Sequence, residues 1–142
     1  MKMSMEEYLD THGYLTYRTA GRSMLPLLHQ SRDLVTVKKK GQERCKVGDV
    51  VLYKRLPNAY VLHRVIEVLP DSYVILGDNC ISKECGILDT DILGVMTECV
   101  RNGKQVRVSQ PWYRGYTFVW LHTISVRTLV KRAWCWLRHK GA

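Results

Sequence analysis

The sequence predicts a mainly β protein with a short helix near its N-terminus and a basic amphipathic helix at its C-terminus. Three observations favour this fold class. Segments rich in β-branched and aromatic residues follow one another from Tyr14 to Ser109, and Gly, Pro, Asn and Asp separate them. After Pro111 the pattern changes to a helical period. With 142 residues, the chain has the length of one domain with a real core.

The N-terminal helix is predicted by its capping residues. Ser4 and Glu7 have the spacing of a capping box, and Gly13 is a residue typical of a helix C-terminus. We therefore expect a helix from about Met5 to His12.

A run of about seven strands is expected next. Turn residues such as Pro57-Asn58 and Gly77-Asp78-Asn79 separate them, and Asn102-Gly103 between alternating residues indicates a hairpin. Together the strands predict a mostly antiparallel β domain over residues 1–110. The segments are 14–19, 33–39, 49–55, 59–68, 72–77, 92–100 and 104–109.

Residues 111–142 are predicted to form a separate helical tail. Charged residues within it exclude an ordinary membrane-spanning helix. Trp120 and Ile124 break the amphipathic pattern, so the helix is imperfect. One side of a helical wheel carries Phe118, Val126, Leu129, Ala133, Trp136 and Leu137, and the opposite side carries Arg127, Lys131 and Arg138.

The positive charge of the chain is concentrated in this tail and in the segment before it. Residues 1–98 contain 13 basic and 13 acidic side chains, whereas residues 99–142 contain nine Lys or Arg and no Asp or Glu. Two explanations remain open: the apolar side packs on the β domain or a partner protein, or residues 112–140 bind peripherally to an anionic membrane. A single basic helix without a reader motif is weak evidence for nucleic-acid binding, and we expect none.

Composition also bears on location and cofactors. Met1 is followed by a polar, acidic segment instead of the apolar run of a signal peptide or anchor. The five cysteines form no CxxC motif, which favours reduced thiols. We expect a cytoplasmic protein, held at the inner membrane surface if the tail binds lipid, with no metal and no cofactor.

Three polar residues could carry chemistry, although each also has an ordinary structural explanation. Ser23 lies between Gly21 and Pro26 in an expected turn, where its hydroxyl and its own N–H would be exposed. His63 alternates with valines in a strand, a position that core histidines often occupy. Asp78, between Gly77 and Asn79, is typical of a turn.

In combination and in order, these residues fall in six short boxes that resemble the type I signal peptidase family. That family belongs to a superfamily that includes the self-cleaving SOS repressors. The boxes cover about residues 14 to 100. They are 21-GRSMLP-26, 33-DLVTV-37, 48-GDVVLY-53, 61-VLHRV-65, 77-GDN-79 and 92-ILG-94.

The resemblance implies coiled antiparallel β-sheets with the serine on a loop at one end of a substrate groove. It implies cleavage of a peptide that binds in extended form, after a small side chain. It also assigns Ser23 as the nucleophile, with its N–H as an oxyanion donor, and His63 as the general base. Leader peptidases and SOS repressors have lysine at the base position, so with His63 the chain resembles the endoplasmic-reticulum-type, Ser-His-acid branch.

The acid of the site stays open between two residues. Asp78 is the first choice to orient and charge-match the imidazole. Some relatives use a carboxylate a few residues beyond the GDN box, and there this chain has Glu84, with Asp89 and Asp91 further on. In that alternative Asp78 is a structural turn residue.

Three features depart from the family pattern. The membrane helix that precedes the serine in signal peptidases is missing, Gly21 stands where a serine often helps to bind the oxyanion, and Arg32-Asp33 replaces the usual Gly-Asp. A cytoplasmic protease that removes a leader from a small ribosomally made peptide fits these departures better than a protease of exported precursors.

We therefore expect a serine endopeptidase that cleaves a peptide or leader-like segment. The alternative is a non-enzymatic peptide- or membrane-binding β module that keeps the peptidase scaffold. An SOS-type regulator is less consistent with the sequence, because only about twenty residues precede the serine box and His63 replaces the lysine.

Overall fold

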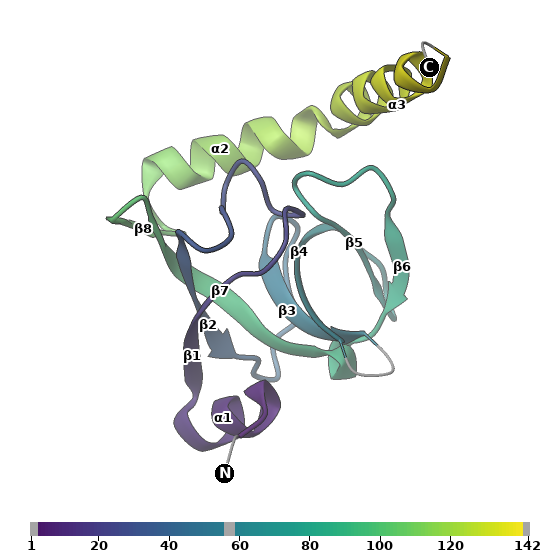
Figure 1. The fold of residues 1–142 in the computed structure, drawn as a ribbon. Coiled ribbons are helices and arrows are strands. Elements are labelled where there is room, and N and C mark those ends of the chain that lie inside the picture. The colour runs from purple at the N-terminus through teal and green to yellow at the C-terminus, as the bar shows by residue number, and fades with distance from the viewer. Residues whose placement is uncertain (1–2, 56–58, 141–142) are drawn as a thin grey trace.

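The computed structural model describes residues 3–55 and 59–140, with Lys140 described by its backbone alone, and it is mainly β as predicted (Figure 1). The expected Pro57-Asn58 turn lies outside the described residues. The elements are α1 (Met5–His12), β1 (Tyr14–Arg18), β2 (Leu34–Lys39), β3 (Val50–Arg55), β4 (Ala59–Val68), β5 (Tyr73–Leu76), β6 (Glu84–Ile87), a short 3-10 helix (Asp89–Asp91), β7 (Ile92–Arg101), β8 (Lys104–Arg107), α2 (Pro111–His122) and α3 (Ile124–Lys140).

All strand pairs in the described residues are antiparallel, in the order β1-β2-β7-β3-β4-β5-β6, with β8 paired to β7. Register shifts interrupt several pairs, for example between Thr36 and Val37 and between Leu52 and Tyr53. Such bulges bend strands and increase their twist. The sheet accordingly curls, and β3 to β6 form a rounded lobe in Figure 1.

Strand β3 is buried on both of its faces. Val50 and Leu52 belong to one apolar cluster, and Val51 and Tyr53 belong to another. Successive side chains of a strand point to opposite faces, so β3 separates the two cores. The continuous apolar run of this strand is therefore explained by burial on both sides.

The local sequence signals near both ends of the β domain are confirmed. The Ser4 hydroxyl accepts from the Glu7 amide at 3.0 Å, and the Glu7 carboxylate accepts from the Ser4 amide at 3.1 Å. Gly13 ends α1 with a φ of 81°. Asn102 and Gly103 join β7 to β8 with φ angles of 50° and 83°, the left-handed region that a tight hairpin requires.

Two elements differ from the sequence prediction. The strand β6 was not predicted, because Glu84-Cys85-Gly86-Ile87 has little β propensity and forms a strand only by pairing with β5. The tail forms two helices instead of one. Thr123, at their junction, donates its hydroxyl proton to the Val119 carbonyl at 2.7 Å, a local bond that competes with helix continuation.

The orientation of the tail contradicts part of the first explanation for it, that its apolar side packs on the β domain. The apolar side does not pack on the β domain: Phe118, Val126, Leu129 and Leu137 are all exposed. Tyr113 and Trp120 face the domain instead, together with the basic side of α3. Among the described residues, no helix combines the length and apolarity needed to cross a bilayer.

Candidate active site

Ser23 and His63 line the same open pocket, which has a volume of about 790 Å³. Its walls come from the end of β1 and the segment after it, from the first half of β4, and from residues 79–82 with Glu84 at the start of β6. The helix α3 contributes Lys131 and Cys135. The structure therefore brings the predicted nucleophile and base, forty residues apart in sequence, to one cavity.

Asp33 and Arg101 hold the loop that carries Ser23 in place. The buried Asp33 carboxylate accepts from the amides of His29 and Asn102, each at 2.9 Å, and from the Arg32 guanidinium. Arg101 donates to the carbonyls of Leu27 at 2.7 Å and Pro26 at 3.2 Å. The Arg32-Asp33 pair that departs from the family pattern thus ties the serine loop to the β7–β8 hairpin.

The GDN loop, residues 77–79, binds the other side of the serine loop. The Asn79 amide donates to the Ser23 carbonyl at 2.8 Å, and the Asn79 side chain donates to the Arg22 carbonyl at 3.0 Å. Gly77 lies against both catalytic candidates: a Cβ at this position would be 2.7 Å from the Ser23 carbonyl oxygen and 3.0 Å from His63 Cδ2. Only glycine fits this junction without displacing the backbone.

The hydroxyl and the amide of Ser23 are both unoccupied among the residues that the structure describes. Within residues 3–55 and 59–140, neither group forms a hydrogen bond. The Gly21 amide is not available in the same way, because it donates to Gln30 Oε1 at 2.9 Å. The Ser23 N–H is therefore open to a ligand, whereas the Gly21 N–H is not.

His63 lies on β4 with 7% of its surface exposed, and its Nδ1 is 3.2 Å from the Tyr53 hydroxyl on β3. The pKa of His63 is lowered from 6.5 to about 4, first by burial and then by the nearby Arg55 charge, while the Asp78 charge opposes both. The imidazole is thus neutral at pH 7. Because Nδ1 contacts Tyr53, Nε2 is the nitrogen left for a substrate or for Ser23.

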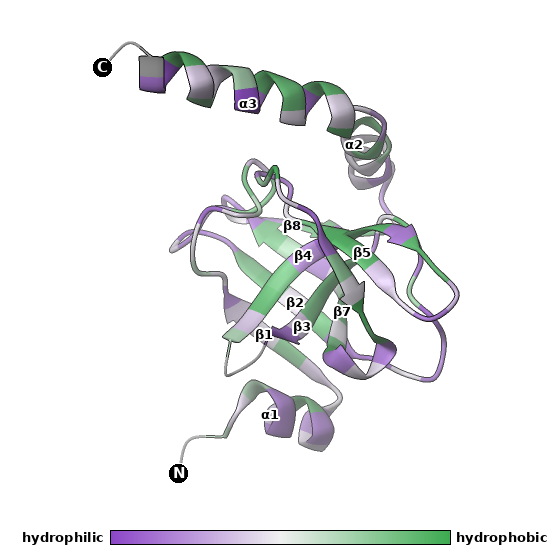
Figure 2. Ribbon diagram, turned by 90° about the vertical axis from the view of Figure 1, so that its right-hand side faces the viewer, coloured by the Kyte–Doolittle hydropathy of each residue, from purple (hydrophilic) through white to green (hydrophobic). Residues whose placement is uncertain are grey.

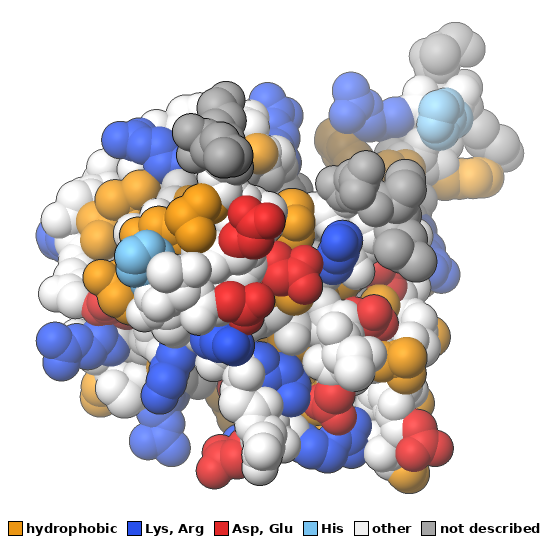
Figure 3. Space-filling model, turned by 90° about the horizontal axis from the view of Figure 1, so that it is seen from below, with side chains coloured by type: hydrophobic (Ala, Val, Ile, Leu, Met, Phe, Trp, Pro, Cys, Tyr) orange, Lys and Arg blue, Asp and Glu red, His pale blue; other side chains and the backbone are white. Residues whose placement is uncertain are grey.

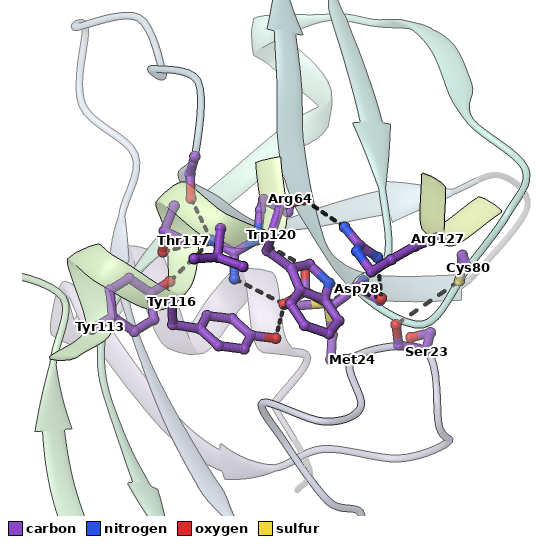
Figure 4. Close-up of polar contacts among 12 residues, drawn as sticks. Ser23, Met24, Arg64, Asp78, Cys80, Tyr113, Tyr116, Thr117, Trp120 and Arg127 are labelled. Atoms are coloured by element: carbon purple, nitrogen blue, oxygen red, sulfur yellow. Dashed lines mark hydrogen bonds and ion pairs between the residues drawn. The ribbon is translucent and has the colours of Figure 1, made fainter. Parts of the chain in front are cut away.

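Asp78 is the centre of a buried network that joins β4 to the helix α2 (Figure 4). Its carboxylate accepts from Arg64 Nε at 2.8 Å, from Arg64 Nη2 at 2.9 Å and from the Tyr116 hydroxyl at 2.8 Å. Its backbone carbonyl accepts from Trp120 Nε1 and Arg127. Among the described residues, no hydrogen bond joins Asp78 to His63. It acts on the imidazole through charge.

The other acidic candidates are also paired elsewhere. Glu84 lines the pocket and forms an ion pair with Arg55, which in turn donates to the Tyr53 hydroxyl at 3.3 Å. Asp89 binds Tyr73, Lys40 and Arg44, and Asp91 caps the short 3-10 helix. Of these carboxylates, only Glu84 connects to His63 by contacts, through Arg55 and Tyr53.

Sequence reasoning did not assign a role to Tyr53 or Arg64, although both lie inside the quoted boxes, in GDVVLY and VLHRV. A signal for Arg64 was present, since an arginine on the buried face of a strand needs an acidic partner. The Tyr53 contact depends on the register that pairs Val51 with His63, which sequence alone does not give.

The described residues contain no cluster of three or more His, Cys, Asp or Glu side chains able to hold a metal ion. All five cysteines are free thiols. Comparison of the chain with protein-family models, with curated proteins and with solved structures finds no match.

Proposed function

We propose that this protein is a serine endopeptidase of the signal-peptidase type, in which Ser23 is the nucleophile and His63 the general base. The observation that carries the proposal is the shared pocket: a serine with an uncommitted hydroxyl and a neutral, mostly buried histidine line one cavity. Gly77 contacts both, so their relative position is set by tight packing and not by two independent loops.

The chemistry follows from the protonation state of His63. Its Nε2 accepts the Ser23 proton as Oγ attacks the scissile carbonyl carbon, and the Ser23 N–H binds the oxyanion that forms. The imidazolium then gives this proton to the leaving amine as the peptide C–N bond breaks. Water, deprotonated by the same nitrogen, cleaves the acyl-enzyme ester and restores the serine hydroxyl.

Tyr53 is the positioning residue in this proposal. For Nε2 to act as a base, Nδ1 must carry the proton and donate it to the Tyr53 oxygen. Burial raises the pKa of Tyr53 to about 12, so the phenol stays neutral. The Arg55 cation that donates to the same oxygen is balanced by Glu84, which makes Glu84 the acid linked indirectly to the base. Asp78 is then the structural acid.

The substrate is a peptide in extended conformation. The two ends of the sheet, β1 and β6, are edge strands, and Arg18 of β1 and Glu84 of β6 both line the pocket. An edge strand offers unpaired backbone N–H and C=O groups with which an extended peptide can pair. Cleavage after a small residue and removal of a leader from a small peptide remain part of the proposal.

A mass-spectrometric screen of a mixed peptide library tests the function. The protein is expected to cut a subset of peptides, and Ser23→Ala and His63→Ala are expected to lower the rate at least about a thousandfold. Ser82→Ala is the matched control, because this serine also lines the pocket. If wild type and both variants process the library equally, the proposal is wrong.

One observation favours a second candidate, a peptide-binding module without catalysis. No carboxylate among the described residues hydrogen-bonds to His63, so the imidazolium formed during catalysis would lack a direct counter-ion. Binding of an uncleaved library peptide by wild type and Ser23→Ala alike, with no product from either, would favour this module.

A further inference from the structure

The two C-terminal helices expose an apolar surface on the side away from the β domain. We name it the outer face and define it by residues that are each between 53% and 68% exposed: Phe118, Val119, Val126, Leu129, Val130, Trp136 and Leu137. Figure 1 shows α3 projecting beyond the sheet, and in Figure 2 hydrophobic segments recur along its length. A helix of a globular protein normally buries such a stripe.

The polar side of α3 is the side that contacts the β domain. Arg127 donates to the Asp78 carbonyl at 3.1 Å, and Lys131 binds the Asn79 carbonyl and side chain. These contacts hold α3 with Arg127 and Lys131 inward and its apolar residues outward. The exposure of the outer face therefore follows from specific bonds to the GDN loop.

The charges beside the outer face are all positive. At about 100° per residue, Arg132 lies next to Trp136 at the border of the outer face, whereas Arg138 lies between Arg127 and Lys131 on the opposite side. No Asp or Glu occurs after residue 98. In Figure 3 the acidic side chains in view lie over the β domain, and the projecting end of the molecule shows basic, histidine and hydrophobic side chains.

Exposed apolar side chains beside positive charges favour one binding partner for the outer face. A second copy on the same face would bring arginines of both copies together with no acidic partner on either helix. An anionic bilayer satisfies both features: its headgroups attract Lys and Arg, and its interface takes up Trp, Phe and Leu side chains.

We propose that the outer face inserts into the headgroup region of an anionic lipid membrane, with α3 parallel to the surface. Lys131 and Cys135, on the opposite side of α3, line the pocket with Ser23 and His63. The pocket then lies roughly one helix diameter, about 10 Å, above the lipid. The enzyme meets peptides that are themselves close to the membrane surface.

Vesicle flotation with the Ser23→Ala protein tests the membrane proposal without depending on peptidase activity. Binding is expected to vesicles of phosphatidylglycerol and phosphatidylcholine, and to be at least about tenfold weaker with phosphatidylcholine alone. Val130→Glu is expected to weaken binding to the anionic vesicles about tenfold or more. Val47→Glu is the matched control, because Val47 is a similarly exposed valine on the β domain, and this variant should bind as the parent does.

A second pair of variants tests the basic border. Arg132→Gln is expected to weaken anionic-vesicle binding by about fivefold, since each basic residue near such a surface contributes about that factor. Lys83→Gln, an exposed lysine outside the helices, should have no effect. Absence of binding to anionic vesicles, or binding that Val130→Glu leaves unchanged, overturns the proposal. Sedimentation that shows a dimer which Val130→Glu dissociates overturns it too, in favour of a second copy.

Discussion

Replacement of Asp78 by asparagine separates a structural from a catalytic role for the residue that the sequence favoured as the site acid. Asp78 and Arg64 are 4% and 1% exposed, and two of the Arg64 nitrogens bind the carboxylate at 2.8 and 2.9 Å. Asparagine keeps one acceptor oxygen, turns an NH₂ group toward one guanidinium nitrogen, and leaves the buried Arg64 charge without a counter-ion.

The expected cost follows from these contacts. Loss of one partner of a buried ion pair costs about 3–5 kcal/mol of unfolding free energy. With a urea dependence of about 2 kcal/mol per molar, the unfolding midpoint should fall by about 2 M. Asp71→Asn, at an exposed turn, is the control and should change the unfolding free energy by less than about 0.5 kcal/mol.

A double variant keeps this prediction testable if the single one unfolds. Arg64→Met removes the buried charge that Asp78→Asn leaves unpaired. The double variant should therefore lose at least about 1.5 kcal/mol less unfolding free energy than the sum of the two single variants. Additive costs, or a cost of Asp78→Asn below about 1 kcal/mol, would refute a structural role for the pair.

Activity provides the second readout. Loss of the acid that hydrogen-bonds the histidine in a Ser-His-Asp site lowers turnover about ten-thousandfold. Because Asp78 contacts Arg64 and not His63, the folded fraction of Asp78→Asn should lose no more than about a hundredfold in turnover on a peptide that the wild type cleaves. A ten-thousandfold loss in fully folded protein would make Asp78 the catalytic acid.

Four further outcomes are expected. Gly77→Ala should abolish peptide cleavage and cost about 1–3 kcal/mol in urea unfolding, because its Cβ would lie 2.7 Å from the backbone oxygen of Ser23; cleavage at the wild-type rate would contradict the packing argument. The pKa of His63 is about 4 in the fold against 6.5 in the unfolded chain, so its contribution to the free energy of unfolding is complete above pH 6.5. This contribution, up to about 3 kcal/mol, is lost as pH falls from 6.5 through 4. His63→Gln should remove this component, so parallel pH-dependent slopes for variant and wild type would disprove it. Tyr53→Phe should lower kcat more than KM and shift the acidic limb of the pH–rate profile, whereas a purely structural tyrosine would leave that limb in place. Thr19→Val should be neutral or stabilising by about 1 kcal/mol in thermal unfolding, because the Thr19 hydroxyl is buried without a hydrogen-bond partner among the described residues; a clear loss of stability would show that it has one.

Local and periodic features of the fold were readable from the sequence. The capping box of Ser4 and Glu7, the Asn102-Gly103 turn and the mainly antiparallel β class were all predicted, because each depends on neighbouring residues or on short-range alternation. The strand β6 was not, since Glu84–Ile87 is a strand only by virtue of the partner that it pairs with.

The amino-acid sequence by itself determined which residue types could do chemistry: a serine in a Gly- and Pro-flanked turn, a histidine in a strand and an acid in the GDN loop. The tertiary structure alone decided how they are used. Pairing of β3 with β4 placed Tyr53 against His63, and burial of Arg64 bound the Asp78 carboxylate. The GDN loop, through the Asp78 and Asn79 carbonyls, binds the basic side of α3 and so leaves the apolar side of this helix exposed. Sequence periodicity defines the two sides of a helix, but only long-range contacts decide which of them faces the protein.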